Sequence, residues 1–157
     1  MINKNKSFWS DDAGLSSRSN EWETPQELYN ELDKEFSFTL DPCATKESAK
    51  CNKYYTEEDN GLIQDWGGVV FMNPPYGRQI NKWIEKAYKE SLKGATVVCL
   101  IPARTDTRYW WDYIFPYAEI RFIKGRIKFK KDGISAPAPF PSAIVIFSND
   151  KLKPTNK

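Results

Sequence analysis

The sequence has 157 residues, of which 40% are hydrophobic and 28% charged, which is typical of a single folded domain and excludes a disordered chain. No apolar run approaches the roughly 20 residues that a membrane-spanning helix needs, and the N-terminus lacks the apolar core of a signal peptide, so we expect a cytoplasmic protein. The absence of histidine excludes Ser-His and Cys-His nucleophile pairs, and the three cysteines form no CxxC pair, so we expect no metal site.

The charge is unevenly distributed along the chain. Residues 1–78 contain 8 Lys and Arg against 14 Asp and Glu, a net charge of −6, whereas residues 79–157 contain 15 against 7, a net charge of +8. This asymmetry favours a cationic or neutral partner for the first half and an anionic partner for the second. On charge alone, two ordinary solvated surfaces explain it equally well.

The N-terminal part is predicted to hold a flexible arm and one helix. Residues 1–20 are rich in Asn, Ser, Asp and Lys, a composition typical of a mobile arm. Thr24 as N-cap and Pro25 at the first helical position predict the start of a helix over 25–35, in which apolar residues recur at helical spacing.

Alternating and continuous apolar runs predict the remaining elements. Segment 36–40 alternates and stops at Asp41-Pro42, which favours a strand and a turn, and 44–66 is expected to form short turns and loops. Buried strands are expected at 68–72, 95–102, 119–123 and 143–147, and helices at 80–92 and 106–115. A strand and turn over 125–135 and a proline-rich loop over 136–142 precede the last strand.

Strands and helices follow one another in turn along the chain, and the strands are apolar at consecutive positions. Together these features predict an α/β fold with a mostly parallel sheet and helices on both faces. In such sheets, ligands bind beyond the carboxyl ends of the strands. The turns at 41–42, 73–76 and 102–104 are therefore expected to converge on one crevice.

The turn Asn73-Pro74-Pro75-Tyr76 follows the apolar strand "VVFM" directly. Its two proline rings hold the backbone rigid, and the Pro74 carbonyl and the Asn73 side-chain oxygen are two hydrogen-bond acceptors. Two fixed acceptors can hold the two hydrogens of an exocyclic amine, and Tyr76 offers a flat ring for stacking. The pattern favours a receptor for a planar amine; the alternative is a tight turn with an amide cap and a packed ring.

The segment from Ile123 to Lys130 alternates apolar and basic residues. Ile123, Ile127 and Phe129 would be buried, while Lys124, Arg126, Lys128 and Lys130 would face phosphates or, in the alternative interpretation, only solvent. Arg104 and Arg108 are further candidates for contact with nucleic acid. Tyr109, Trp110 and Trp111 are consistent with either stacking on a base or core packing.

Several motifs together resemble one enzyme family. In chain order they are "WETPQELYNEL", "FTLDPCA", "DNGLIQDW", "FMNPPYG", "LIPARTDTRYW", "IKGRIKF" and "PSAIVIF", which cover about residues 20–147. This series resembles the phage-type DNA N6-adenine methyltransferases of the Dam family, which depend on S-adenosylmethionine. The resemblance implies a Rossmann-like methyltransferase fold, abridged between the first strand and the NPPY strand, over residues 21–148, followed by a polar tail at 149–157.

The resemblance also implies roles for individual residues. It implies that Asn73, Pro74, Pro75 and Tyr76 hold and stack the target adenine. The residues that it places against the cofactor are Trp22, Thr24, Pro25, Asp41, Pro42, Asp59 and Asn73. The segment "DPCAT" after Asp41 lacks the Gly-rich turn that many methyltransferases place there.

The expected function is therefore methyl transfer from S-adenosylmethionine to the N6 amine of an adenine flipped out of double-stranded DNA. We expect no membrane partner, and of the possible oligomeric states we favour a monomer. One alternative is a methyltransferase that acts on RNA adenine or on a protein glutamine amide. A second is a catalytically inert nucleic-acid-binding module.

Overall fold

The computed structural model describes residues 22–131 and 133–149. The arm expected at 1–20 and nearly all of the tail expected at 149–157 therefore lie outside the described residues. None of the helices in the described ranges is long and apolar enough to cross a bilayer.

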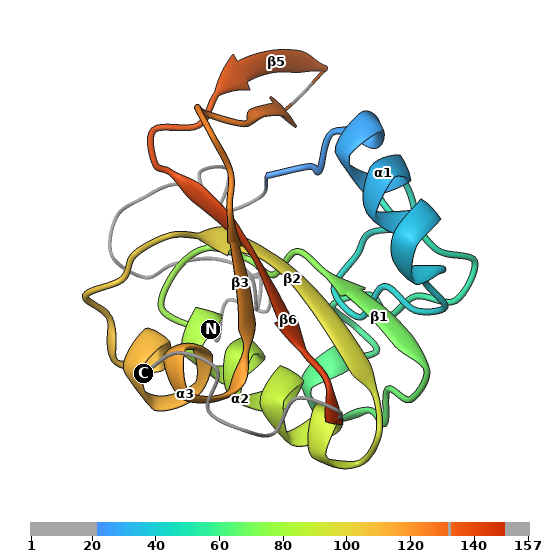
Figure 1. The fold of residues 1–157 in the computed structure, drawn as a ribbon. Helices are drawn as coiled ribbons and strands as arrows, with labels where there is room; N and C mark the ends of the chain where they lie inside the picture. Colours follow the sequence, from blue (N-terminus) through green and yellow to red (C-terminus); the bar gives the residue numbers. More distant parts are fainter. Residues whose placement is uncertain (1–21, 132, 150–157) are drawn as a thin grey trace, which may run out of the picture.

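A four-stranded sheet with the order β1-β2-β6-β3 forms the centre of the molecule (Figure 1). Its strands are β1 (Val69–Met72), β2 (Thr96–Pro102), β6 (Ser142–Phe147) and β3 (Glu119–Phe122). β1 and β2 are parallel, but β6 runs antiparallel to both β2 and β3. The α/β class is thus confirmed, whereas the prediction of a mostly parallel sheet is wrong. The chain passes from β3 to β6 without a crossover helix, and such a return pairs strands antiparallel.

The strand predicted over 36–40 is reduced to one bridge. Leu40 forms a parallel bridge with Val70 at the free edge of β1. Phe36 belongs to the preceding helix, which ends at Ser37 with a left-handed φ of 56°. Too few residues remain between the helix end and Leu40 for a regular strand.

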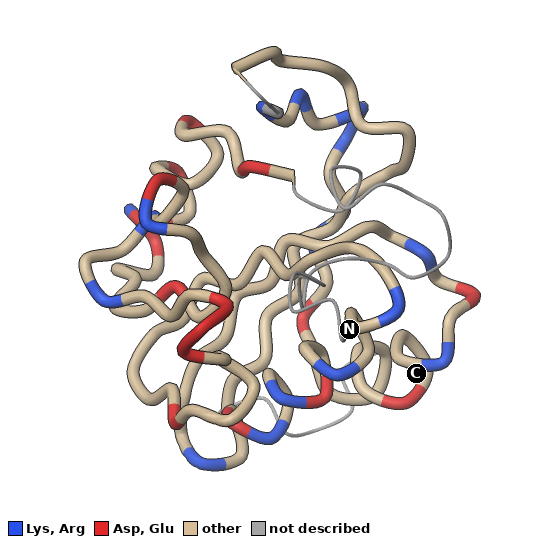
Figure 2. The backbone as a smooth tube through the Cα atoms, turned by 180° about the vertical axis from the view of Figure 1, so that it is seen from behind, with Lys and Arg blue, Asp and Glu red and all other residues tan. Residues whose placement is uncertain are grey.

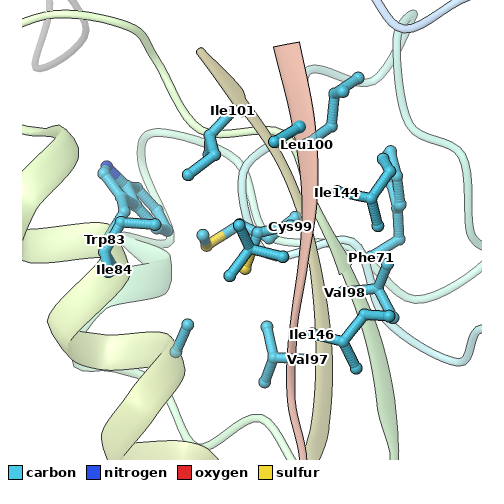
Figure 3. Close-up of a cluster of buried hydrophobic side chains, with 14 of the residues drawn as sticks. Phe71, Trp83, Ile84, Val97, Val98, Cys99, Leu100, Ile101, Ile144 and Ile146 are labelled. Atoms are coloured by element: carbon cyan, nitrogen blue, oxygen red, sulfur yellow. The ribbon is translucent and has the colours of Figure 1, made fainter. Parts of the chain in front are cut away.

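Helices pack on both faces of the sheet. Figure 3 shows buried side chains on both sides of the strands and the helix that covers one side. On one face, α2 (Ile80–Leu92) packs the fully buried Trp83 and Ile84 against β2. On the other face lies α1 (Gln26–Phe36), where the rings of Tyr29 and Phe71 meet at a centroid distance of 5.2 Å. Every residue of β6 is buried, which explains why its sequence does not alternate.

The start of α1 differs from its prediction. Pro25, rather than Thr24, occupies the N-cap position, and no side chain caps the helix. The Thr24 hydroxyl instead accepts a hydrogen bond from the side chain of Asn73. A tertiary partner has therefore replaced the local capping interaction that the sequence suggested.

The helix expected at 106–115 is shifted and irregular. Residues 108–117 are helical and include a π-helical stretch, Trp110–Ile114, followed by α3 (Phe115–Tyr117). Tyr109 and Trp110 are buried in the core, whereas the side chain of Trp111 is 63% exposed. Core packing is thus confirmed for Tyr109 and Trp110, whereas stacking of a base on Trp111 stays a prediction.

A hairpin of β4 (Lys128–Lys131) and β5 (Ile134–Pro137) forms a second sheet, which projects from the end of the main sheet that lies opposite α2 (Figure 1). The basic segment predicted as one strand from Ile123 to Lys130 is therefore interrupted between β3 and β4, where Gly125 adopts a φ of 76°. β5 also occupies the start of the predicted proline-rich loop. A short 3-10 turn, η2 (Gly61–Ile63), lies in the loop region expected at 44–66.

Glu90 joins α2 to the loop that leads into β1. Its buried carboxylate accepts hydrogen bonds from Lys86 at 2.6 Å, from Lys93 at 3.2 Å and from the backbone N–H of Trp66 at 3.3 Å. Burial by itself raises the pKa of Glu90, but these hydrogen bonds outweigh it and hold the pKa below its ordinary value. The carboxylate is therefore a compensated charge that stabilises this junction.

Glu90→Ala should lower the free energy of unfolding by about 3 kcal/mol, because the largely buried Lys86 ammonium loses its carboxylate. Glu85→Ala on the same helix is the matched control, since its pair with Lys89 is exposed and should contribute about 0–1 kcal/mol. Denaturant unfolding of both variants measures the difference. Equal losses would contradict the structural role of Glu90.

Candidate active site

Asn73 lies at the carboxyl end of β1, and all polar atoms of its side chain have partners. The amide nitrogen donates to the backbone carbonyl of Trp22 at 2.6 Å and to the Thr24 hydroxyl at 2.9 Å. The amide oxygen accepts a hydrogen bond from the Tyr76 hydroxyl at 2.7 Å. Residues separated by about 50 positions are thereby joined at one side chain.

Tyr76 is packed into the protein rather than presented at its surface. Its side chain is 4% exposed, and its hydroxyl also lies 3.0 Å from the backbone carbonyl of Leu100 on β2. Burial raises the pKa of the Tyr76 phenol well above its ordinary value. The packed ring and amide contact match the alternative interpretation of this turn, so stacking of a base on Tyr76 stays a prediction.

Two further aromatic rings pack against Tyr76, and a third packs against those two. Phe129 and Phe140 approach its ring edge-on, at centroid distances of 6.3 and 5.5 Å. Trp22 contacts both of these rings, at 5.6 and 5.7 Å. We call Trp22, Tyr76, Phe129 and Phe140 the aromatic cluster. The guanidinium of Arg104 lies 5.8 Å from the Phe140 ring and so borders this cluster.

Phe129 and Phe140 lie at the site although no role there was predicted for them from the sequence. Alternation did predict that Phe129 is buried, but alternation does not identify the partner. Phe140 lies in a proline-rich segment that has no periodic pattern. The one available signal was that this segment directly precedes β6, the strand that pairs with β2 in the main sheet.

Asp41 follows the Leu40 bridge, in a loop that contacts Asn73 through Cys43. The residue is 5% exposed, and its carboxylate accepts hydrogen bonds from the backbone N–H groups of Cys43 at 3.4 Å and Lys50 at 3.1 Å. The Cys43 thiol in turn donates to the backbone carbonyl of Asn73 at 3.4 Å. Burial raises the pKa of Asp41 to about 6, although the two backbone hydrogen bonds and the Lys50 charge act in the opposite direction.

The other residues expected near a cofactor lie around this loop. Pro42 is buried, and its carbonyl approaches Gly61 so closely that a side chain at position 61 would collide with it. Asp59 is exposed, and its carboxylate accepts hydrogen bonds from the backbone N–H and the hydroxyl of Thr56. Asp59 therefore closes a local turn, and its contact with a cofactor stays a prediction.

The three turns expected to converge do lie together in the described part of the chain. Cys43 joins the first turn to Asn73, and the backbone N–H of Ala103 donates to Pro141 beside Phe140. The carboxyl end of β1, the loop after β2 and the Asp41 loop thus surround one region.

The basic residues predicted to contact nucleic acid are all exposed. Figure 2 shows Lys and Arg residues along the hairpin and its connection to β3, at the end of the molecule that also contains the start of the described chain. On β4, Lys128 and Lys130 are exposed while Phe129 is buried, as the alternation predicted. Lys124 and Arg126 lie in the β3–β4 connection, whereas Arg108 lies on the helical segment within 4.0 Å of Asp112.

Comparison of the sequence with known proteins identifies one family. A model of the family described as DNA N-6-adenine-methyltransferase (Dam) matches residues 13–153. The chain is 30% identical over 115 residues to a DNA N-6-adenine-methyltransferase of Escherichia phage T1, a match that covers 71% of this chain and 48% of the phage protein.

Two further relatives match shorter segments. A DNA N-6-adenine-methyltransferase of Haemophilus phage HP1 (strain HP1c1) is 32% identical over 94 residues, 58% of this chain and 54% of that protein. A putative methyltransferase of Escherichia coli (strain K12), YfdM, is 37% identical over 70 residues, 40% of this chain and 77% of that protein. The matches thus span about half the length of the two phage relatives.

The raised pKa of Asp41 predicts a pH-dependent contribution to stability. Because the folded protein binds this proton more tightly than the unfolded chain, the stabilising effect is fully present below about pH 4 and is lost as the pH rises through about 6. Asp41→Asn removes the titration. The free energy of unfolding of the variant, relative to the natural protein, should therefore rise by roughly 3 kcal/mol between about pH 4 and pH 7.

Denaturant unfolding over this pH range measures that difference. Asn offers one acceptor oxygen where Asp offers two, but the stability lost with that hydrogen bond is the same at every pH. The pH dependence of the difference in free energy of unfolding is therefore unaffected. The matched control is Asp106→Asn, which removes an exposed carboxylate in another loop. A difference for Asp41→Asn that does not change with pH would show that the pKa of this carboxyl is the same in the folded and the unfolded protein.

Proposed function

Because the chain belongs to the DNA N-6-adenine-methyltransferase (Dam) family, we propose that it transfers a methyl group from S-adenosylmethionine to the N6 amine of adenine in double-stranded DNA. The observation that carries this proposal is the fixed side-chain amide of Asn73 at the carboxyl end of β1. Its oxygen is an acceptor with two lone pairs, of which the Tyr76 hydroxyl uses one. The second is available to one hydrogen of the target amine.

The residues around Asp41 fit the cofactor by charge. S-adenosylmethionine carries a positively charged sulfonium and an ammonium group, and its role is to supply the methyl group. A buried carboxylate whose partners are two backbone N–H groups gains most from a nearby cation. Asp41 and Pro42, together with Trp22 and Pro25, would hold the methionine end, and Asp59 would contact the ribose or adenine.

The chemistry requires orientation more than proton transfer. The sequence contains no histidine, and an amine that attacks a methyl group releases its proton late and readily to water. Asn73 and the Pro74 carbonyl would hold the amine so that its lone pair points along the line of attack. Pro75 would keep this turn rigid, and Tyr76 would support the ring of the base.

The fold is consistent with an abridged Rossmann-like methyltransferase domain. The parallel succession Leu40, β1 and β2 places Asp41, Asn73 and the loop after Pro102 at the same edge of the sheet. β6, which is antiparallel, closes the sheet between β2 and β3. Ligands of α/β sheets bind at such carboxyl edges.

The hairpin and its connection to β3 would bind the DNA backbone. Its exposed cations, with Arg104 and Arg108, suit phosphates, and a base inside a duplex must be flipped out at a cost of a few kcal/mol to reach Asn73. Arg104 borders the aromatic cluster, with its guanidinium 5.8 Å from the Phe140 ring. It would therefore contact the flipped base or its neighbour.

The proposal is tested by incubating the protein with labelled S-adenosylmethionine and random-sequence DNA, RNA or a protein mixture in parallel. Label should appear on DNA alone, and mapping should locate it on adenine N6 within one short sequence. Label found only on RNA or protein would refute the DNA assignment. Absence of transfer to every substrate, with retained DNA binding, would identify an inert binding module.

Asn73→Ala should reduce methyl transfer by more than about a hundredfold, because the amine loses an acceptor that is needed for its orientation. Cofactor affinity, measured by calorimetry, should change by less than about threefold. Tyr76 keeps the Leu100 carbonyl as an acceptor, so the turn should remain folded. Unchanged turnover would remove Asn73 from the chemistry.

Lys128→Ala should weaken DNA binding to all sequences alike and reduce the slope of log affinity against log salt by about 1. The control is Lys89→Ala, which changes an exposed lysine on α2, at the other end of the molecule from the hairpin (Figure 1). Fluorescence anisotropy at several salt concentrations measures both slopes. An unaltered slope for Lys128→Ala would exclude this strand from the interface.

A further inference from the structure

The side-chain amide of Asn73 can be oriented in only one way by its surroundings. The Trp22 backbone carbonyl, 2.6 Å away, is an acceptor only, so it must face the amide NH2 group. The Tyr76 hydroxyl then meets the amide oxygen as a donor. A rotation of the amide by 180° would place an oxygen against the Trp22 carbonyl, and both groups would lack a proton to share.

Thr24 holds the second hydrogen of that amide. Its hydroxyl lies 2.9 Å from the Asn73 nitrogen, and its side chain is 3% exposed, so water does not readily take its place. With Thr24 present, both amide hydrogens are used within the protein. The oxygen of Asn73 is left as the only part of the amide with spare hydrogen-bonding capacity, and it can only accept.

The segment that contains Thr24 is fixed to the hairpin. Glu23 and Lys130 form an antiparallel bridge through two backbone hydrogen bonds of 3.3 and 3.4 Å. The Trp22 ring packs on Phe129 of the same strand. The position of the Thr24 hydroxyl therefore depends on β4, the strand that also carries the exposed Lys128 and Lys130.

We propose that Thr24 is a positioning residue, which holds the Asn73 amide with its oxygen toward the target amine and links this orientation to the hairpin. This inference rests on the proposed function for its effect on catalysis. It differs from the role that family resemblance implies for Thr24, which is contact with the methionine end of the cofactor. The two roles predict opposite kinetic effects.

Thr24→Val is the central variant, because valine has the shape of threonine but offers no acceptor to the amide. It should lower kcat by about tenfold, the effect of one lost hydrogen bond, while the KM for S-adenosylmethionine changes by less than about twofold. Thr24→Ser keeps the hydroxyl and should restore at least about half of the natural kcat. A raised KM for the cofactor with unchanged kcat would overturn the inference in favour of cofactor contact.

Thr39→Val is the matched control for a general loss of stability. The Thr39 hydroxyl donates to the Val69 carbonyl at the other end of β1, away from Asn73. This variant should lower the melting temperature and leave kcat within about twofold of the natural value. If it lowers kcat as much as Thr24→Val does, the effect of Thr24 is not specific and the positioning role is refuted.

A second measurement does not depend on activity. The two side-chain amide protons of Asn73, identified in NMR spectra by their loss in Asn73→Ala, should exchange slowly with solvent in the natural protein. In Thr24→Val, exchange should accelerate by at least about tenfold, and in Thr24→Ser it should not. Unchanged exchange in Thr24→Val would refute the positioning role, whereas accelerated exchange in a protein without methyl transfer would support it and refute the proposed function alone.

Discussion

The side-chain amide of Asn73 is the interaction on which the arrangement of the site depends. It joins the segment before α1 to the carboxyl end of β1, and through Tyr76 it reaches the backbone of β2. The segment before α1 is in turn bridged to β4. Four parts of the chain that lie far apart in sequence are thus linked, directly or through one neighbour, to this amide. Its hydrogen bonds are partly buried, which makes a missing partner costly.

The buried carboxylates of Glu90 and Asp41 illustrate two different uses of a charge. Two lysines and a backbone N–H surround Glu90 and lower its pKa, so its charge is compensated by the protein itself. Asp41 has two backbone N–H groups, and burial keeps its pKa raised. Glu90 is therefore suited to hold a helix in place, whereas Asp41 would be stabilised by a cation that comes from outside the chain.

The sequence predicted individual elements better than their relations. The strands at 68–72, 95–102 and 143–147 and the helix from Ile80 to Leu92 are close to their expected bounds, because burial on both faces or on one stripe leaves a periodic pattern. Strand direction leaves no such pattern, so antiparallel β6 was missed. Thr24 was misassigned for a similar reason: its best partner lies 49 positions away, and local rules consider only neighbours. The rule that ligands of α/β sheets bind beyond the carboxyl ends of the strands, rather than periodicity alone, predicted that the turns with Asp41, Asn73 and Tyr76 lie close together.

The shortest hydrogen bond of the Asn73 side chain has an unusual relation to mutation. Its acceptor is the backbone carbonyl of Trp22, which any amino acid at position 22 would also supply. Substitutions there can alter the ring that contacts Phe129 and Phe140, but they cannot delete the acceptor. An alanine scan would consequently describe residue 22 as a packing residue and overlook its second contribution. Only a change in the path of the backbone, such as an insertion beside it or the loss of its bridge to Lys130, would reveal what that carbonyl does.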